Sequence, residues 1–189
     1  MSLAAAADIQ RGTAANRLVL RDGSVATVRP ATPEDRDAVR RFYHDLSPES
    51  RHRRFMTAGE APHAIIDRLC DSSDPTKLTT LVAFRHLPDG VHIIAVCSYV
   101  AINAATAEVA FAVDDHFQGK GIATSMLERL ATIAADHGFH WFQASTLYEN
   151  AAMLDVFRDS GFEVRSTPLS EFEKAEGGVT CLSIIFSAK

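Results

Sequence analysis

A chain of 189 residues with 47% hydrophobic and 23% charged residues has the size and composition of one globular domain. Its formal net charge of −5 disfavours nucleic acid as a partner, because binding to a phosphate backbone needs a basic surface. No apolar run approaches the roughly 20 residues of a membrane-spanning helix, so we also expect no membrane partner.

The N-terminal residues 1–16 carry an alanine run but neither the basic start nor the long apolar centre of a secretory signal. We expect a flexible tail over this segment and a single domain over residues 17–189. The three cysteines are far apart and fit neither a disulfide framework nor the spacing of a metal site: Cys70, Cys97 and Cys181. They favour a cytoplasmic protein with reduced thiols and no bound metal.

The first third of the domain is predicted to form a hairpin followed by three helices. Two β-prone runs flank Asp22-Gly23 over residues 17–30, and this dipeptide is a common turn pair. Thr32 as N-cap and Pro33 at the first helical position then start a helix. Its apolar face is expected to contain Val39, Phe42, Tyr43 and Leu46. Two short helices follow in "SPESRHRRFM" and "APHAIIDRLCD", the second with Ile65, Ile66 and Leu69 facing inward.

Three β-like segments come next, and then helices and strands alternate. The segments "LTTLVAF", "VHIIAVCSYVAI" and "AEVAFAV" are joined by short polar breaks, which favours antiparallel neighbours. A long helix over about residues 121–136 precedes the strand "HWFQASTL", the helix "NAAMLDVFRDS" and the final strands "FEVRST" and "GVTCLSIIF". This order predicts an α/β (α+β) fold with one mixed sheet, antiparallel at its start and β-α-β-α-β at its end.

The stretch "EVAFAVDDHFQGKGIATSML", residues 108–127, places two close glycines between a strand and the long helix. The start of a helix presents free backbone N–H groups and a positive dipole end, which suit a phosphate. Gly119 and Gly121 lack Cβ atoms and let a phosphate approach those amides, while Lys120 can add charge at the rim. The same glycines could equally shape a turn that binds nothing. The Walker pattern is absent, and the dinucleotide pattern breaks at Thr124.

The pattern "QGKGIA" resembles the Q/R-x-x-G-x-G/A motif of the GNAT superfamily of acyl-CoA N-acyltransferases. The resemblance extends over nearly the whole chain from about residue 18. The segments "VRPATPEDRDAVRRFYHDLSPESRHRRF", "AEVAFAVDDHFQGKGIAT" and "ENAAML" look like the acetyltransferase domain of bacterial Pat-type protein lysine acetyltransferases. The resemblance implies a GNAT fold and an enzyme that moves the acetyl group of acetyl-CoA to an amine, with a protein lysine side chain as the first candidate.

The resemblance also implies where the coenzyme lies. Its pyrophosphate would lie on the glycine loop, and its pantetheine arm would pair with the strand before that loop, where this strand splays from the next. Asn150 matches a position that often contacts the coenzyme arm, although an ordinary N-cap is its other interpretation. The implied coenzyme-binding residues are Phe111, Ala112, Val113, Gln118, Gly119, Lys120, Gly121, Ile122, Ala123, Thr124 and Asn150.

An acceptor lysine with a pKa near 10.4 must lose a proton before it can attack a thioester. Glu108 lies in an apolar strand, on the face opposite Val109, and could be either a base or a solvated strand-end residue. In the Pat-type enzymes a glutamate in the matching "AE.AF" segment acts as general base, so the resemblance implies this role for Glu108. Burial would raise its pKa and make it a better base. Many relatives carry a tyrosine general acid where this chain has Phe157, so the general acid stays open.

Several alternatives remain beside this prediction. The acceptor could be a small amine, or the domain could be a non-catalytic acyl-CoA sensor that shares the phosphate loop and needs no base. The basic run Arg51–Arg54 is interpreted as a solvated helix face; contact with an acidic acceptor protein or with the ribose phosphate of the coenzyme is the alternative. Exposed strand edges are compatible with a monomer or a homodimer.

Overall fold

The computed structural model describes residues 16–56, 62–166 and 178–186, so the predicted tail lies outside the described residues except for Asn16. The elements are, in chain order, β1 (Arg17–Val19), β2 (Val25–Pro30), the short 3-10 helix η2 (Pro33–Asp35), α2 (Arg36–Asp45), α3 (Pro48–Phe55), α4 (His63–Leu69), β3 (Leu78–Leu87), β4 (Gly90–Ala101), β5 (Thr106–Val113), the 3-10 helix η3 (Asp115–Phe117), α5 (Ile122–Asp136), β6 (Trp141–Leu147), α6 (Ala151–Asp159), β7 (Glu163–Ser166) and β8 (Val179–Ile185).

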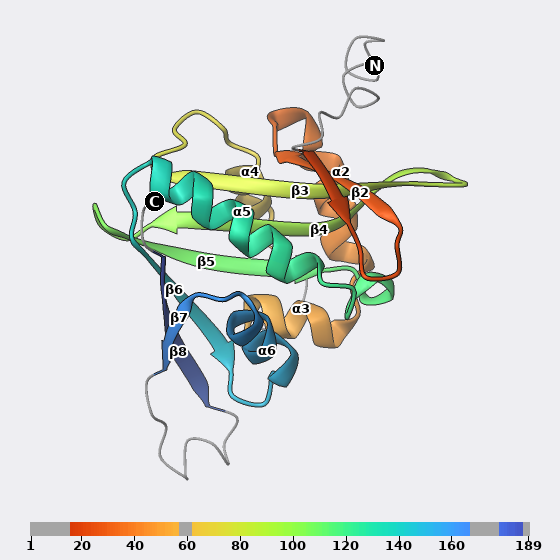
Figure 1. Cartoon of the computed structure of the whole chain (residues 1–189). Helices are drawn as coiled ribbons and strands as arrows, with labels where there is room; N and C mark the ends of the chain where they lie inside the picture. Colours follow the sequence, from red (N-terminus) through yellow and green to blue (C-terminus); the bar gives the residue numbers. More distant parts are fainter. Residues whose placement is uncertain (1–15, 57–61, 167–177, 187–189) are drawn as a thin grey trace.

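The described strands form one eight-stranded sheet in the order β1-β2-β3-β4-β5-β6-β8-β7 (Figure 1). All neighbours are antiparallel except β5 and β6, which are parallel, so the predicted mixed sheet is confirmed. The parallel pairing joins only Thr106–Glu108 to Trp141–Gln143. Beyond Glu108, β5 continues to pair with β4 as far as Val113 but no longer pairs with β6. Strands β5 and β6 therefore diverge after Glu108. This divergence opens the middle of the sheet beside the glycine loop.

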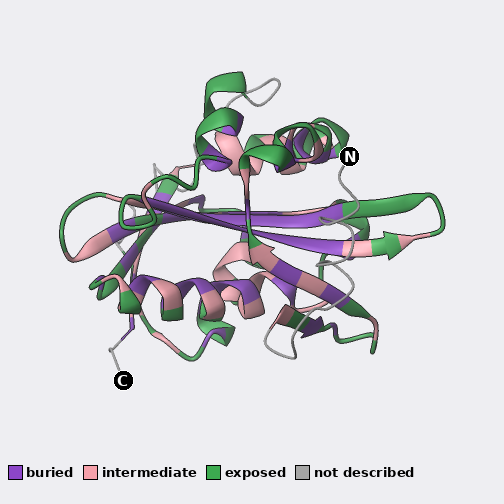
Figure 2. Ribbon diagram, turned by 90° about the horizontal axis from the view of Figure 1, so that it is seen from above, coloured by how far each residue is buried: buried purple, intermediate pink, exposed green. Residues whose placement is uncertain are grey.

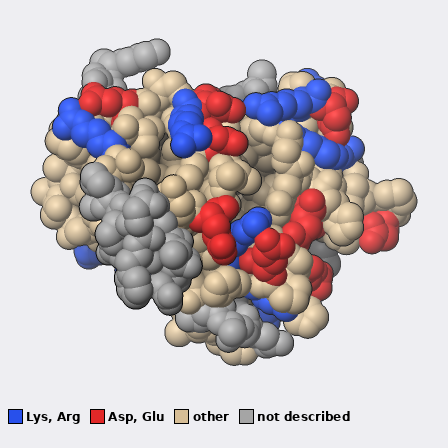
Figure 3. Space-filling view, turned by 90° about the horizontal axis from the view of Figure 1, so that it is seen from below, with Lys and Arg blue, Asp and Glu red and all other residues tan. Residues whose placement is uncertain are grey.

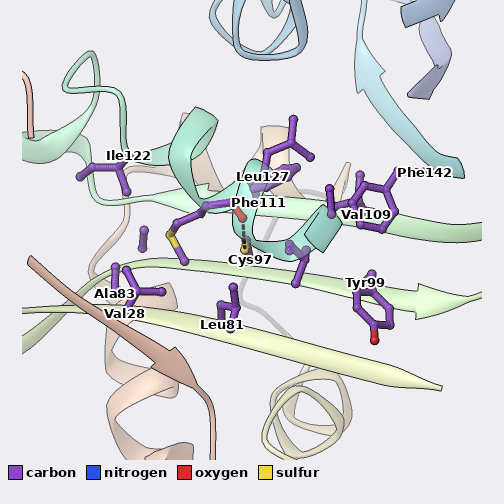
Figure 4. Packing of buried hydrophobic residues seen from close by; sticks show 14 of the residues in the cluster. Val28, Leu81, Ala83, Cys97, Tyr99, Val109, Phe111, Ile122, Leu127 and Phe142 are labelled. Atoms are coloured by element: carbon purple, nitrogen blue, oxygen red, sulfur yellow. Dashed lines mark hydrogen bonds between the residues drawn. The ribbon is translucent and has the colours of Figure 1, made fainter. Parts of the chain in front are cut away.

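Helices cover both faces of the sheet, with α5 on one face and α2 and α4 on the other (Figure 2). Beneath α5, side chains from most strands of the sheet form a core with Leu127 and Ile122, and Figure 4 shows Phe111 and Cys97 among them. The opposite core contains Val39, Phe42 and Tyr43 of α2, as the apolar spacing predicts. Both faces of the central strands are therefore buried, and only the strand ends and the divergence reach the surface.

Some boundaries differ from the prediction. Pro33 opens the 3-10 helix η2, and the α-helix proper begins three residues later at Arg36. Ile65 was expected to face inward but is 36% exposed, because the seven-residue helix α4 buries only the narrow stripe of Ile66 and Leu69. One buried stripe on so short a helix takes residues three apart, and the neighbouring position points to solvent.

An ion pair between the buried Asp35 and the partly exposed Arg29 links the start of α2 to β2. Asp35, 7% exposed, accepts bonds of 2.7 and 2.8 Å from the Arg29 guanidinium and one of 2.8 Å from the backbone N–H of Thr32. Burial acts to raise the pKa of Asp35, but the bonds from Arg29 and Thr32 outweigh it and lower this pKa below its ordinary value. The charged form of Asp35 therefore stabilises the fold.

We expect Asp35→Asn to lower the free energy of unfolding by about 2 kcal/mol near neutral pH, because Arg29 is left without its charged partner. A folded-state pKa below the unfolded one gives stability that is present above about pH 4 and lost as the pH falls through the folded value. Urea unfolding at about pH 7 and about pH 3 tests this, since the difference between wild type and variant should shrink at the lower pH. An equal difference at both pH values would contradict the assignment.

Candidate active site

A cleft of about 350 Å³ lies where the glycine loop and the start of α5 face α6 and α3. All of the residues that the sequence predicts for coenzyme binding line this cleft except Lys120. Those that line it are Phe111, Ala112, Val113, Gln118, Gly119, Gly121, Ile122, Ala123, Thr124 and Asn150. Residues up to 39 positions apart in the chain thus meet at one concave surface.

The loop between β5 and α5 has a backbone that only glycine adopts easily at two positions. Gly119 and Gly121 have φ angles of +72° and +80°, in the left-handed region. A Cβ atom built at Gly119 would meet no other atom within 4 Å, so the backbone there is open to a ligand. The first bond within α5 runs from the Ser125 N–H to the Gly121 carbonyl, which leaves the preceding N–H groups at the helix start unbonded by the helix. These amides and the open loop fit a phosphate group.

Lys120, which the sequence predicts at the rim, is not among the residues that line the cleft. Its ammonium lies 2.9 Å from Asp22 of the β1–β2 turn and 5.0 Å from the centre of the Phe117 ring. The Ser24 hydroxyl and Lys120 together lower the pKa of Asp22, so this carboxylate stays charged and holds the lysine. The turn packs against the loop through the Arg21 N–H, which donates to the Lys120 carbonyl at 3.1 Å.

Three arginines line the cleft beside the predicted coenzyme-binding residues. Arg21 comes from the β1–β2 turn, while Arg53 and Arg54 come from α3. The basic run in α3 was interpreted as a solvated face, but two of its members face the cleft because α3 packs beside β5. No local pattern in the sequence marks Arg21, whose place depends on the docking of the turn against a loop about 100 residues later.

The divergence of β5 and β6 forms a narrow slit that continues the cleft. A hollow of about 30 Å³ lies there, lined by Val109–Phe111 of β5, Ala144–Thr146 of β6, and Asn150. Asn150 is buried and caps α6, since its side chain accepts a bond of 3.3 Å from the Met153 N–H. Phe157 is buried beside the slit and contacts Phe111 edge to face with 6.2 Å between ring centres. The position where many relatives carry tyrosine therefore holds no proton donor.

Glu108 is the last β5 residue before the divergence, opposite Val100 of β4 and Gln143 of β6. Its side chain is exposed and not buried in the sheet. It does not line the cleft, but the next residue, Val109, lines the slit. A carboxylate here faces solvent on the side of the sheet opposite α5, next to the opening in the strands.

Asp115 joins α3 to the glycine loop. Its carboxylate accepts bonds from the backbone N–H and the hydroxyl of Ser47, both at 2.9 Å, and from the Ser50 hydroxyl at 2.7 Å. The Gln118 amide donates to the Ser50 hydroxyl and to the Val113 carbonyl, both at 3.2 Å. The helix that carries Arg53 and Arg54 is therefore bonded directly to the loop that faces the cleft.

We expect Asp115→Ala to weaken coenzyme A binding several-fold, because each lost hydrogen bond contributes about 1 kcal/mol and α3 loses its anchor. Hydrogen exchange of the α3 amides should speed up, while Asp45→Ala, which removes an exposed carboxylate next to His44, should leave it unchanged. Calorimetric titration and exchange measured by mass spectrometry check both effects. Unaltered exchange in α3 would show that Asp115 does not hold the helix.

Figure 3 shows basic and acidic side chains interspersed on the face viewed from below, without a broad basic area. Within residues 16–56, 62–166 and 178–186, no cluster of three or more His, Cys, Asp or Glu could hold a metal ion. No helix in the same ranges is long and apolar enough to cross a membrane.

Comparison with known proteins adds independent information. The acetyltransferase PA5475 of Pseudomonas aeruginosa is 30% identical over 151 residues, which are 79% of this chain and 81% of that protein. The acetyltransferase Pat of Mycolicibacterium smegmatis is 29% identical over 139 residues, 72% of this chain. The match spans only 41% of the Mycolicibacterium protein, so that relative is much longer than the matched region.

Solved structures agree with the fold. The GNAT domain of S. lividans PAT superposes with a TM-score of 0.77 at 31% identity, over 90% of this chain and 96% of that domain. The protein YncA of Salmonella typhimurium, solved with acetyl-CoA as its cofactor, shares the fold with a TM-score of 0.65 at 18% identity, over 87% of this chain and 94% of that one. Residues 26–163, most of the chain, match the family described as "Acetyltransferase (GNAT) domain". The chain therefore belongs to the GNAT acetyltransferase family.

Proposed function

We propose that the protein is an acetyl-CoA-dependent N-acetyltransferase that acts on lysine side chains of proteins, by direct transfer with Glu108 as general base. The observation that carries this proposal is the cleft itself, which leads from a phosphate-sized loop at the start of α5 to a slit between β5 and β6. A ligand with phosphates at one end and a reactive thioester at the other fits this shape. The GNAT domain and the likeness to the S. lividans PAT domain support it further.

The coenzyme would be held mainly by backbone groups. The N–H groups of Ile122–Thr124 and the open backbone at Gly119 would receive the pyrophosphate. Beyond Glu108, β6 no longer pairs with the edge of β5, so the amide groups of the pantetheine arm can pair there as an added strand would. Asn150 lies at the entrance of the slit, where it lines the cleft and also caps α6.

Acetyl-CoA supplies the thioester, and the residues of this chain handle protons and charge. Glu108 would take the proton that the acceptor ammonium must lose, directly or through one water molecule. Backbone N–H groups of β5 at the slit would polarise the carbonyl while the N–C bond forms and the C–S bond breaks. The leaving thiolate, with a thiol pKa near 8.5, would take its proton from water because Phe157 has none to give.

Direct transfer is favoured over a covalent acyl-enzyme because no cysteine lines the cleft. Cys97 is buried and Cys181 is half-buried. Burial raises the pKa of Cys70 to about 11 and that of Cys97 further still, so both remain protonated thiols.

Two observations favour a protein lysine over a small cationic amine as the acceptor. The relatives of the Pat type are similar over most of this chain. In addition, Arg53 and Arg54 line both the cleft and the slit, and positive charge there disfavours polyamines but suits a lysine within an acidic surface. The test is release of the coenzyme A thiol from acetyl-CoA with a panel of lysine-bearing proteins, polyamines and amino acids. Thiol release with small amines alone would show that the acceptor is a small amine and not a protein lysine. Binding of acetyl-CoA without any thiol release would favour a non-catalytic sensor.

A further inference from the structure

We propose that Arg21 binds the 3′-phosphate of coenzyme A and thereby makes the cleft select coenzyme A over its 3′-dephospho form. The proposal rests on the proposed function, since it requires the coenzyme to occupy the cleft. It assigns this phosphate to a residue that neither the glycine motif nor the basic run of α3 points to. In this proposal the cation that meets the phosphate is Arg21 of the β1–β2 turn and not Lys120 of the loop.

The position of Arg21 along the cleft indicates which part of the coenzyme it meets. Asn150 and Phe111 mark the end of the cleft at the slit, where the thioester would lie. Helix α6 forms one wall from Ala152 to Asp159. With a rise of 1.5 Å per residue, the nine residues from Asn150 to Asp159 cover about 13 Å. Arg21 faces Asp159, so it lies at the far end, where the nucleotide would be.

The backbone of Arg21 is fixed, whereas its guanidinium is weakly held. The N–H of Arg21 donates to the Lys120 carbonyl at 3.1 Å, and its side chain crosses Gly121, where a Cβ atom would lie 3.3 Å from Nε. The guanidinium lies 3.8 Å from Asp159, with side chains that are 66% and 60% exposed. An exposed pair at this distance contributes little, so a phosphate that accepts two bonds from the guanidinium can replace it.

The charges around Arg21 explain why a cation is needed there. The backbone amides of the loop would bind the pyrophosphate, and a second phosphate group at the far end would need a cationic partner of its own. The wall of α6 presents the carboxylates of Asp155 and Asp159, which would repel a phosphate without a cation between them. Lys120 cannot serve, because Asp22 holds its ammonium at 2.9 Å.

A cycle that combines two ligands with four proteins tests the proposal. Calorimetric titration gives the Kd of coenzyme A and of 3′-dephospho-coenzyme A for the wild type, Arg21→Met, Asp159→Asn and the matched control Lys120→Met. We expect the wild type to bind coenzyme A about 10-fold tighter than the dephospho form, as one charge-assisted contact provides. This ratio should fall to about 1 in Arg21→Met, through loss of coenzyme A affinity alone, and persist in Lys120→Met.

The Asp159→Asn variant has an effect of opposite sign, because it frees Arg21 for the phosphate. It should bind coenzyme A as tightly as the wild type or more tightly, with the affinity for the dephospho form unchanged. An unchanged ratio in Arg21→Met overturns the proposal, and an equal loss for both ligands would place Arg21 at the pyrophosphate instead. Failure of the wild type to bind either ligand would overturn the coenzyme site as a whole, which separates that failure from an error about Arg21.

Discussion

Substitution of Glu108 by glutamine is expected to lower kcat by about 10²–10⁴-fold and to leave the Kd of acetyl-CoA unchanged. The amide keeps the size of the side chain but cannot accept a proton from the acceptor ammonium. The coenzyme affinity should not change, because Glu108 is exposed and lies outside the cleft. Thiol release, measured on the acceptor that the wild type uses fastest, gives kcat, and calorimetric titration gives the Kd.

Glu128→Gln is the matched control for this variant, since Glu128 is an exposed carboxylate on α5 that does not line the cleft. It should retain wild-type turnover and affinity. Equal turnover in Glu108→Gln and Glu128→Gln would exclude Glu108 as the base. A parallel loss of coenzyme affinity in Glu108→Gln would instead point to a structural role at the end of the β5–β6 pairing.

Substitution of Gly119 by alanine is expected to weaken coenzyme A binding by about 10-fold or more. A left-handed backbone costs a non-glycine residue about 1–2 kcal/mol. The loop would therefore change its conformation, and its N–H groups would no longer point together at the phosphate. The added methyl group would also enter open space that borders the cleft. Calorimetric titration with coenzyme A and urea unfolding measure the two effects separately.

Gly138→Ala separates a binding effect from simple backbone strain. Gly138 follows α5 with a φ of +88° and likewise has no atom within 4 Å of a built Cβ, but it does not line the cleft. Both variants should lose similar stability, while only Gly119→Ala should lose affinity. Equal affinities for coenzyme A in the two variants would mean that the loop does not hold the phosphate.

The order of the elements was predictable because each one carries its own local pattern. Asp22-Gly23 marks the hairpin, Thr32-Pro33 marks the helix start, and runs of β-prone apolar residues mark β3, β4 and β5. The close glycines also marked the loop before α5, and the structure shows why glycine is needed there, since few other residues tolerate its left-handed angles. These features depend on neighbours within a few positions in the chain.

The features that the sequence did not reveal depend on long-range packing. The motif predicts Lys120 at the rim but does not predict its ion pair, because the Asp22 carboxylate that holds it comes from a turn about 100 residues earlier. Arg21 reaches the cleft through the same docking, and the exposure of Ile65 depends on how α4 rests on the sheet. The exposure of Glu108 follows from its place at the end of the β5–β6 pairing, which no local pattern marks. Tertiary contacts of this kind override what a local motif suggests.

The most direct test of the whole account is the appearance of acetyl-lysine on an acceptor protein incubated with the purified protein and acetyl-CoA. We expect mass spectrometry to find acetylated lysine side chains in an amount equal to the coenzyme A thiol released, and neither product when Glu108→Gln replaces the wild type. Tight binding of acetyl-CoA without acetyl-lysine or thiol on any acceptor would contradict it, because the cleft would then bind the coenzyme without supporting transfer.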